Sequence, residues 1–198
     1  MSFIPPDFAP ASSEIFMLIM VCVVMLADLT IGKNKRYVAY LLTQITLLGC
    51  AVLTFKSFSD EAVLTFSGMF VDDSLADILK LMTYGTVSAV LIYSYTYISE
   101  RDMLRGEFFS LVLFATLGMM VMISASHFLT LYIGLEILSL SLYALVALRR
   151  DSTEATEAAM KFFVLGALAS GFLLYGMSMV YGATGSLQIT EVAKAIQD

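Results

Sequence analysis

The chain has 198 residues, of which 59% are hydrophobic and only 14% carry a charge. A soluble domain is about half apolar and about a quarter charged, so this composition excludes a soluble globule and indicates an integral membrane protein. The net charge of −6 and the lack of a basic cluster exclude a nucleic-acid-binding protein. Only helices and closed barrels can span a bilayer, and the apolar stretches are continuous rather than alternating, which favours an all-α membrane protein.

Six apolar segments are long enough to cross a membrane as helices. They are predicted at residues 14–31, 37–55, 78–98, 108–125, 128–148 and 157–181. Residues 56–77 are too charged to form a span, and residues 182–198 start as a Gly-rich turn and end as a short amphipathic, polar stretch. Lys80 is interpreted as an interface lysine whose ammonium reaches the headgroups. Asp28, near the end of the first span, is likewise predicted to lie at the interface.

The N-terminus lacks a positive segment before an apolar one, so the first span is predicted to be retained rather than cleaved as a signal peptide. Cys22 and Cys50 lie in apolar runs, where cysteine is most often a small buried hydrophobe. No CxxC or His/Cys spacing suggests a metal or redox site. No P-loop or dinucleotide fingerprint is present, so we expect no hydride or electron chemistry in this chain.

The basic residues are distributed unevenly between the two sides of the predicted membrane. One side receives Lys33, Lys35, Arg36, Arg101, Arg105, Arg149 and Arg150, and the other receives Lys56, Lys194 and the interface residue Lys80. Short loops rich in Lys and Arg face the cytoplasm. The sequence therefore predicts a multi-pass protein of a bacterial inner membrane, with cytoplasmic basic loops and both ends of the chain in the periplasm.

One carboxylate lies within an apolar span. Glu136 is the only charge among the 21 residues from Phe128 to Leu148, roughly 12 Å from one end at about 1.5 Å per residue. A charge at such a depth costs at least about 2.5–3.5 kcal/mol on insertion scales. The functional interpretation is a proton or ion site, and the alternative is a protonated glutamate that is hydrogen-bonded within the helix bundle.

A polar stripe surrounds this glutamate. Tyr132, Glu136, Ser139 and Tyr143 are spaced by 4, 3 and 4 residues, which places all four on one face of a helix. Such a face points into the bundle or a water-filled cavity. The hydroxyls are candidates for a polar relay, although Ser and Tyr also join helices to one another. With the glutamate included, we favour a proton path.

Lys161, in the sixth predicted span, is the second charged candidate for the site. It lies about one turn from the cytoplasmic side, a position that also permits its ammonium to reach the headgroups. Counted from that side, Glu136 is about 18 Å deep and Lys161 about 6 Å deep. A lysine side chain covers only about half of this difference. We therefore expect water between the two residues, or another basic partner for Glu136.

The second half of the chain resembles a known family. The segments GLEILSLSLYALVAL, EAAMKFFVLGALASGFLLYG and YGATGS are similar to subunit N of proton-translocating NADH–quinone oxidoreductase (respiratory complex I), an antiporter-like family. The resemblance implies a membrane-arm subunit that couples electron transfer from NADH to quinone to proton translocation. It places Glu136 at the essential membrane glutamate and Lys161 in the charged chain across the membrane. It also implies that NADH, flavin, iron–sulfur clusters and quinone bind to other subunits, and that this chain binds no cofactor.

Family members have about fourteen helices arranged as inverted repeats, so six spans suggest an N-terminal fragment of that fold. Residues 1–105 would form an N-terminal three-helix region, and residues 106–198 the start of the first repeat. The missing basic partner of Glu136 would then lie in a part not present here. His127 stands at the start of the fifth span, where the family resemblance leads us to expect Asn or Asp. We interpret His127 as a spacer at the helix start rather than as a titrating group. Two other functions stay open: a subunit of a multisubunit sodium/proton antiporter or membrane-bound hydrogenase, and a structural membrane module without transport.

Overall fold

The computed structural model describes residues 7–30, 37–58, 62–101, 103 and 105–197. Within these residues six helices are long and apolar enough to cross a membrane. They are α1 Ser12–Thr30, α2 Tyr37–Ser57, α3 Ser74–Glu100, α4 Gly106–Ile123, α5 Phe128–Val146 and α6 Thr153–Thr184. The six predicted spans are confirmed. A short helix, α7 Ile189–Gln197, follows in the segment predicted to be amphipathic and polar.

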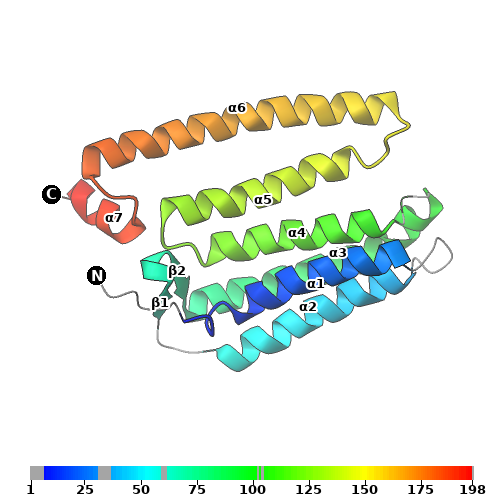
Figure 1. The fold of residues 1–198 in the computed structure, drawn as a ribbon, viewed down its shortest axis with the longest axis horizontal. Helices are drawn as coiled ribbons and strands as arrows, with labels where there is room; N and C mark the ends of the chain where they lie inside the picture. Colours follow the sequence, from blue (N-terminus) through cyan, green and yellow to red (C-terminus); the bar gives the residue numbers. More distant parts are fainter. Residues whose placement is uncertain (1–6, 31–36, 59–61, 102, 104, 198) are drawn as a thin grey trace.

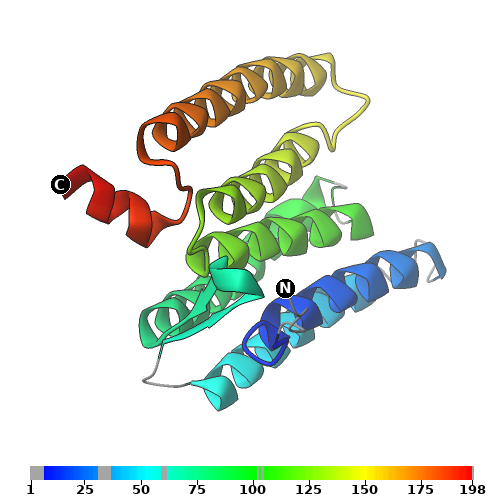
Figure 2. The same cartoon turned by 60° about the vertical axis from the view of Figure 1, so that its left-hand side comes forward.

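The helices lie lengthwise beside one another, with α6 at the outside of the array (Figure 1). Helix α4 is central because it contacts α1, α2 and α3 as well as α5, whereas α6 packs mainly on α5. Figure 2 shows α5 and α6 on the opposite side of α4 from α1 and α2. The apolar core lies among the first four helices and includes Met17, Val21, Leu47, Tyr84, Leu91, Phe109, Leu113 and Met120.

Two glycines bring the backbones of α4 and α5 into direct contact. A Cβ atom at Gly118 would lie 2.6 Å from the backbone nitrogen of Leu138, and one at Gly134 would lie 2.8 Å from the backbone nitrogen of Met122. Small residues at such crossings allow transmembrane helices to approach closely. The α4–α5 interface is therefore fixed by backbone packing, and it orients the rest of α5.

A small hairpin covers one end of the bundle, within the stretch that the sequence marked only as too charged to span. Strands β1 Val63–Thr65 and β2 Phe70–Asp72 pair in antiparallel register around a 3₁₀ turn at Phe66–Gly68. The backbone nitrogen of Val71 donates to Ser124 at 2.9 Å, and that of Ser126 donates to Met69 at 3.1 Å. The hairpin is thereby joined to the turn between α4 and α5.

Helix α6 is longer than predicted and mostly uncovered. It begins four residues early because Ser152 caps it, accepting a hydrogen bond from the Ala155 nitrogen at 3.3 Å. It ends at Gly185, whose φ of 73° is the left-handed conformation typical of a helix C-cap. Only 6% of the residues in the most apolar 18-residue stretch of α6 are buried, against 50% in that of α4. Most of its side chains therefore face away from the described bundle.

Candidate functional site

The start of α5 is fixed by His127. This residue is the N-cap of the helix, and its Nδ1 accepts a hydrogen bond from the Leu129 nitrogen at 3.2 Å. The Phe128 nitrogen donates to the Leu187 carbonyl at 3.0 Å, which ties the helix start to the segment before α7. The predicted position of His127 at the helix start is confirmed, and its side chain has a capping role there.

Glu136 faces α6 rather than the core. Gly134, two residues earlier, contacts α4, and two residues on a helix correspond to a rotation of about 200°. Glu136 is half-buried and accepts a hydrogen bond through Oε1 from the Ser170 hydroxyl of α6. The site therefore lies in the interface between α5 and α6.

Tyr132 joins the same hydrogen-bonded group. Its hydroxyl lies 2.9 Å from the Ser170 hydroxyl, so Ser170 bridges the tyrosine and the glutamate. A serine hydroxyl has one proton to donate. When Ser170 donates to Glu136, Tyr132 must donate to Ser170, which gives the chain a direction. Ser170 was not among the site residues predicted from the sequence, although it links the two helices.

Tyr143 also contacts α6, one turn of that helix away from Ser170. A Cβ atom at Gly166 would lie 1.7 Å from the Tyr143 hydroxyl, so the hydroxyl occupies the space that the glycine leaves open. The ring packs edge-on against Phe162, with centroids 4.9 Å apart. Ser139 is half-buried, and its side chain makes no hydrogen bond to another described residue. Three of the four predicted stripe residues thus meet α6 directly.

Lys161 is not brought to this site. Its ammonium lies 2.6 Å from Oε1 of Glu157, one turn earlier on α6, and the two side chains are 70% and 66% exposed. Nine residues separate Lys161 from Ser170, and that spacing corresponds to two and a half turns. The lysine therefore projects from the face of α6 opposite the one that meets Glu136.

A buried ionic cluster lies elsewhere, at the end of the bundle covered by the hairpin. The Lys80 ammonium lies 2.8 Å from Oε1 of Glu14 and 3.6 Å from Oδ1 of Asp72. Its side chain is 1% exposed, and Asp77 is buried to the same degree. Ser13 adds a hydrogen bond to the other Glu14 oxygen at 2.8 Å. Burial raises the pKa of Asp72, an effect that the positive charge of Lys80 opposes.

The prediction that Lys80 is an interface lysine is wrong. Its nearness to the start of α3 suggested that its ammonium would reach the headgroups, but Asp72 of the hairpin and Glu14 of α1 enclose it. A weak signal of this burial is present in the sequence. Asp77, Lys80 and Tyr84 are spaced by 3 and 4 residues, so they share one helical face, and all three are buried.

Comparison with known proteins gives consistent results. Residues 125–198 match the family described as NADH:quinone oxidoreductase/Mrp antiporter, transmembrane. The chain is 67% identical over 196 residues to NADH-quinone oxidoreductase subunit N of Nitrosomonas europaea, covering 99% of this chain and 41% of that protein. It is 62% identical to the subunit N of Thiobacillus denitrificans, covering 97% and 40% respectively. The chain thus spans about two fifths of the length of these relatives.

Solved structures share the fold. A chain of respiratory complex I from Thermus thermophilus superimposes with a TM-score of 0.70 and 28% identity, over 89% of this chain and 38% of that one. A chain of the membrane-bound sulfane sulfur reductase, an archaeal respiratory membrane complex, superimposes with a TM-score of 0.77 at 23% identity, over 95% of this chain and 40% of that one. Over nearly its whole length, the chain is therefore similar to NADH-quinone oxidoreductase subunit N, and its residues 125–198 match the antiporter family named above.

Proposed function

We propose that this chain is part of a membrane-arm subunit of a bacterial NADH–quinone oxidoreductase, and that protons pass through its α5–α6 interface when NADH reduces quinone elsewhere in the complex. The chain itself would carry out no redox chemistry and bind no redox cofactor. Its partners would be other membrane subunits of the complex. The basic loops would lie in the cytoplasm and both ends of the chain in the periplasm, since Lys and Arg concentrate in the loops predicted on one side of the membrane.

The observation that carries this proposal is the hydrogen-bonded chain Tyr132–Ser170–Glu136. When Glu136 is ionised, its carboxylate accepts from Ser170, which in turn accepts from Tyr132. When Glu136 is protonated, the carboxyl group can donate to Ser170, and both hydroxyls can reverse their direction. One set of side chains thus supports two directions of hydrogen bonding that differ by one proton at Glu136, as a site that takes up and releases a proton requires.

A positive charge that approached Glu136 would favour proton release, because it stabilises the ionised carboxylate. Lys161 faces away from Glu136 and is paired with Glu157. We therefore propose that Lys161 acts in a separate step, on the opposite face of α6, rather than as the ion-pair partner of Glu136. Ser139 and Tyr143 would support the interface, with Tyr143 seated against Gly166.

The test is Glu136→Gln in the complete complex, assayed in membrane vesicles for NADH-driven proton uptake and for NADH–quinone reductase activity. Glutamine can accept a hydrogen bond but cannot take up and release a proton, so both activities should fall while the assembled complex is still present on native gels. Glu154→Gln is the matched control, because it removes an exposed carboxylate from the first turn of α6 and should leave pumping unchanged. Normal proton uptake with Glu136→Gln would contradict the proposal.

The second candidate is a subunit of a sodium/proton antiporter, favoured by the family match that names both kinds of protein. The two candidates separate in one measurement. If the membrane complex that contains this chain exchanges sodium for protons without any NADH–quinone reductase activity, the antiporter assignment replaces the one above. A purely structural role predicts a different result. Glu136→Gln would then lower the amount of assembled complex, while the complex that does assemble would pump protons normally.

A further inference from the structure

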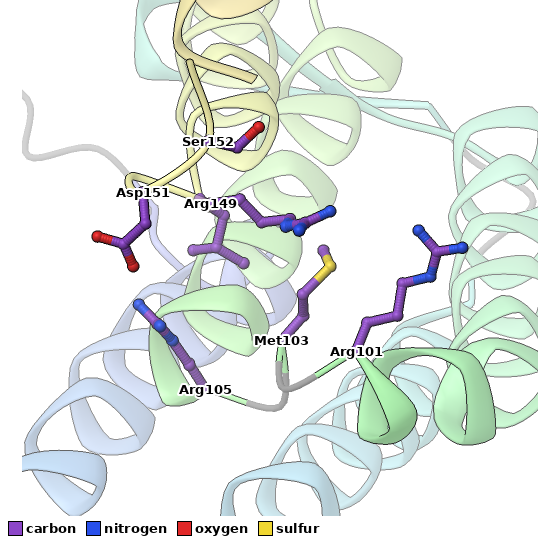
Figure 3. Close-up of a pocket in the computed structure, with 7 residues that line it drawn as sticks. Arg101, Met103, Arg105, Arg149, Asp151 and Ser152 are labelled. Atoms are coloured by element: carbon purple, nitrogen blue, oxygen red, sulfur yellow. The ribbon is translucent and has the colours of Figure 1, made fainter. Parts of the chain in front are cut away.

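A pocket lies at the end of the bundle opposite the hairpin, between the loop from α3 to α4 and the loop from α5 to α6. Its volume is about 400 Å³, and its lining includes Arg101, Arg105, Arg149, Asp151 and Ser152. Figure 3 shows Arg101 and Arg105 on the first loop, and Arg149 extending from the second loop over Met103. Three arginines from two separate connections therefore border one space.

The charge of the lining is positive. The lining contains three arginines and one aspartate, so its formal charge is +2. Ser152 is also the N-cap of α6, a helix of 32 residues, so the positive end of the helix dipole faces this region. Backbone nitrogens at a helix start and guanidinium groups both favour an anion. Arg101 is held in part by its neighbour Tyr97, with the guanidinium carbon 4.6 Å from the ring centroid.

We propose that this pocket binds a phosphate group. Arginine presents paired N–H donors that match two phosphate oxygens, and the pocket volume is within the range of small-ligand sites. Both loops join the ends of membrane spans, so the pocket lies at the level where lipid headgroups meet water. Basic pockets between transmembrane helices are suited to anionic headgroups. The source of the phosphate is therefore a membrane lipid or a soluble phosphate, and the experiment separates the two.

The chain provides a matched control for the arginines. Arg150 is adjacent to Arg149 and equally charged, but it pairs with Glu107 at 3.3 Å and does not line this pocket. Arg150→Gln removes the same charge from the same loop without touching the proposed site. Asp151 provides a test of opposite sign, because Asp151→Asn removes the one negative charge from the lining and should strengthen phosphate binding.

The experiment uses the full chain purified in a non-ionic detergent and titrated with mixed micelles that contain phosphatidylglycerol. A second titration uses inorganic phosphate, and native mass spectrometry counts the bound molecules. Arg105→Gln and Arg149→Gln should each weaken phosphatidylglycerol binding about five-fold, the equivalent of about 1 kcal/mol per basic residue. Arg150→Gln should change binding less than about two-fold. The side chains of Arg105, Arg149, Arg150 and Asp151 are all exposed, so thermal unfolding of the variants should match that of the parent protein.

Arg149→Lys tests the geometry, because lysine keeps the charge but lacks the paired donors of the guanidinium. Binding that weakens with this change supports a phosphate site. Competition by inorganic phosphate would identify a soluble ligand, and binding of phosphatidylglycerol without such competition would identify a lipid headgroup. The proposal is overturned if Arg150→Gln weakens binding as much as Arg149→Gln does, or if oleate, an anionic lipid without phosphate, binds as tightly as phosphatidylglycerol. None of these outcomes depends on proton transport.

Discussion

Replacing Lys80 with methionine should destabilise the protein strongly. The change keeps most of the apolar stem but removes the ammonium that lies 2.8 Å from Glu14 and 3.6 Å from Asp72. Breaking a buried ion pair by removing one partner costs about 3–5 kcal/mol, because the other partner is left as an uncompensated buried charge. For a protein of this size, that loss corresponds to a fall of about 6–20 °C in the melting temperature.

The matched control is Lys161→Met, which also removes a lysine paired with a glutamate on a transmembrane helix. Its side chain is 70% exposed, whereas that of Lys80 is 1% exposed. Exposed ion pairs contribute about 0–1 kcal/mol, so this variant should unfold within a few degrees of the parent protein. The assay is thermal unfolding in detergent, followed by circular dichroism with both variants under the same conditions.

The pH dependence of the Lys80→Met variant tests the cause. Without the ammonium, Asp72 has no positive partner in its buried site, and burial already raises the pKa of Asp72 in the folded protein. An acid with a raised folded-state pKa binds its proton more tightly when folded, so the folded state gains stability as the pH falls towards the unfolded-state value of about 4. The deficit of the variant should therefore shrink between about pH 8 and pH 5. Equal melting temperatures for Lys80→Met and Lys161→Met, or a deficit independent of pH, would refute this account of the cluster.

Five further substitutions probe how α5 is held. Gly166→Ala should weaken the α5–α6 contact by about 1–3 kcal/mol, the usual cost of overpacking, and Tyr143→Phe should relieve part of the loss, as thermal unfolding of the double variant would show. Gly134→Ala should cost at least as much, since its Cβ would meet backbone atoms, whereas Gly171→Ala, with open space around it, should unfold like the parent. Ser170→Ala should slow proton uptake less than Glu136→Gln, because a water molecule can replace a hydroxyl as a bridge.

The spans could be predicted because continuous apolar runs of this length have one stable arrangement in a bilayer. The hairpin could not. Its strands have three residues each, its turn contains Phe66 and Ser67 with φ values of 52° and 58°, and its stability depends on a hydrogen bond from Val71 to Ser124, more than fifty positions later. Neither propensity nor periodicity indicates a contact of that kind.

The candidate site was only partly predictable for a related reason. Helical spacing within α5 placed Tyr132, Glu136 and Tyr143 on one face, and the structure places that face against α6. Spacing within one helix does not reveal which residue of the next helix lies opposite, so Ser170 was missed as a bridge. The same limit explains Lys80, whose carboxylate partners come from α1 and the hairpin.

The two sides of α5 differ in stiffness. Towards α4, the helix rests on backbone atoms at Gly118 and Gly134, and such a contact cannot yield without moving a whole helix. Towards α6, it is held by the packing of Tyr143 and by hydroxyl groups that reorient by rotation about single bonds, and little of α6 is buried. When the charge of Glu136 changes, we expect α5 to act as the fixed reference and α6 as the part that shifts. A spin label on α6 should then report the protonation state more strongly than one on α4.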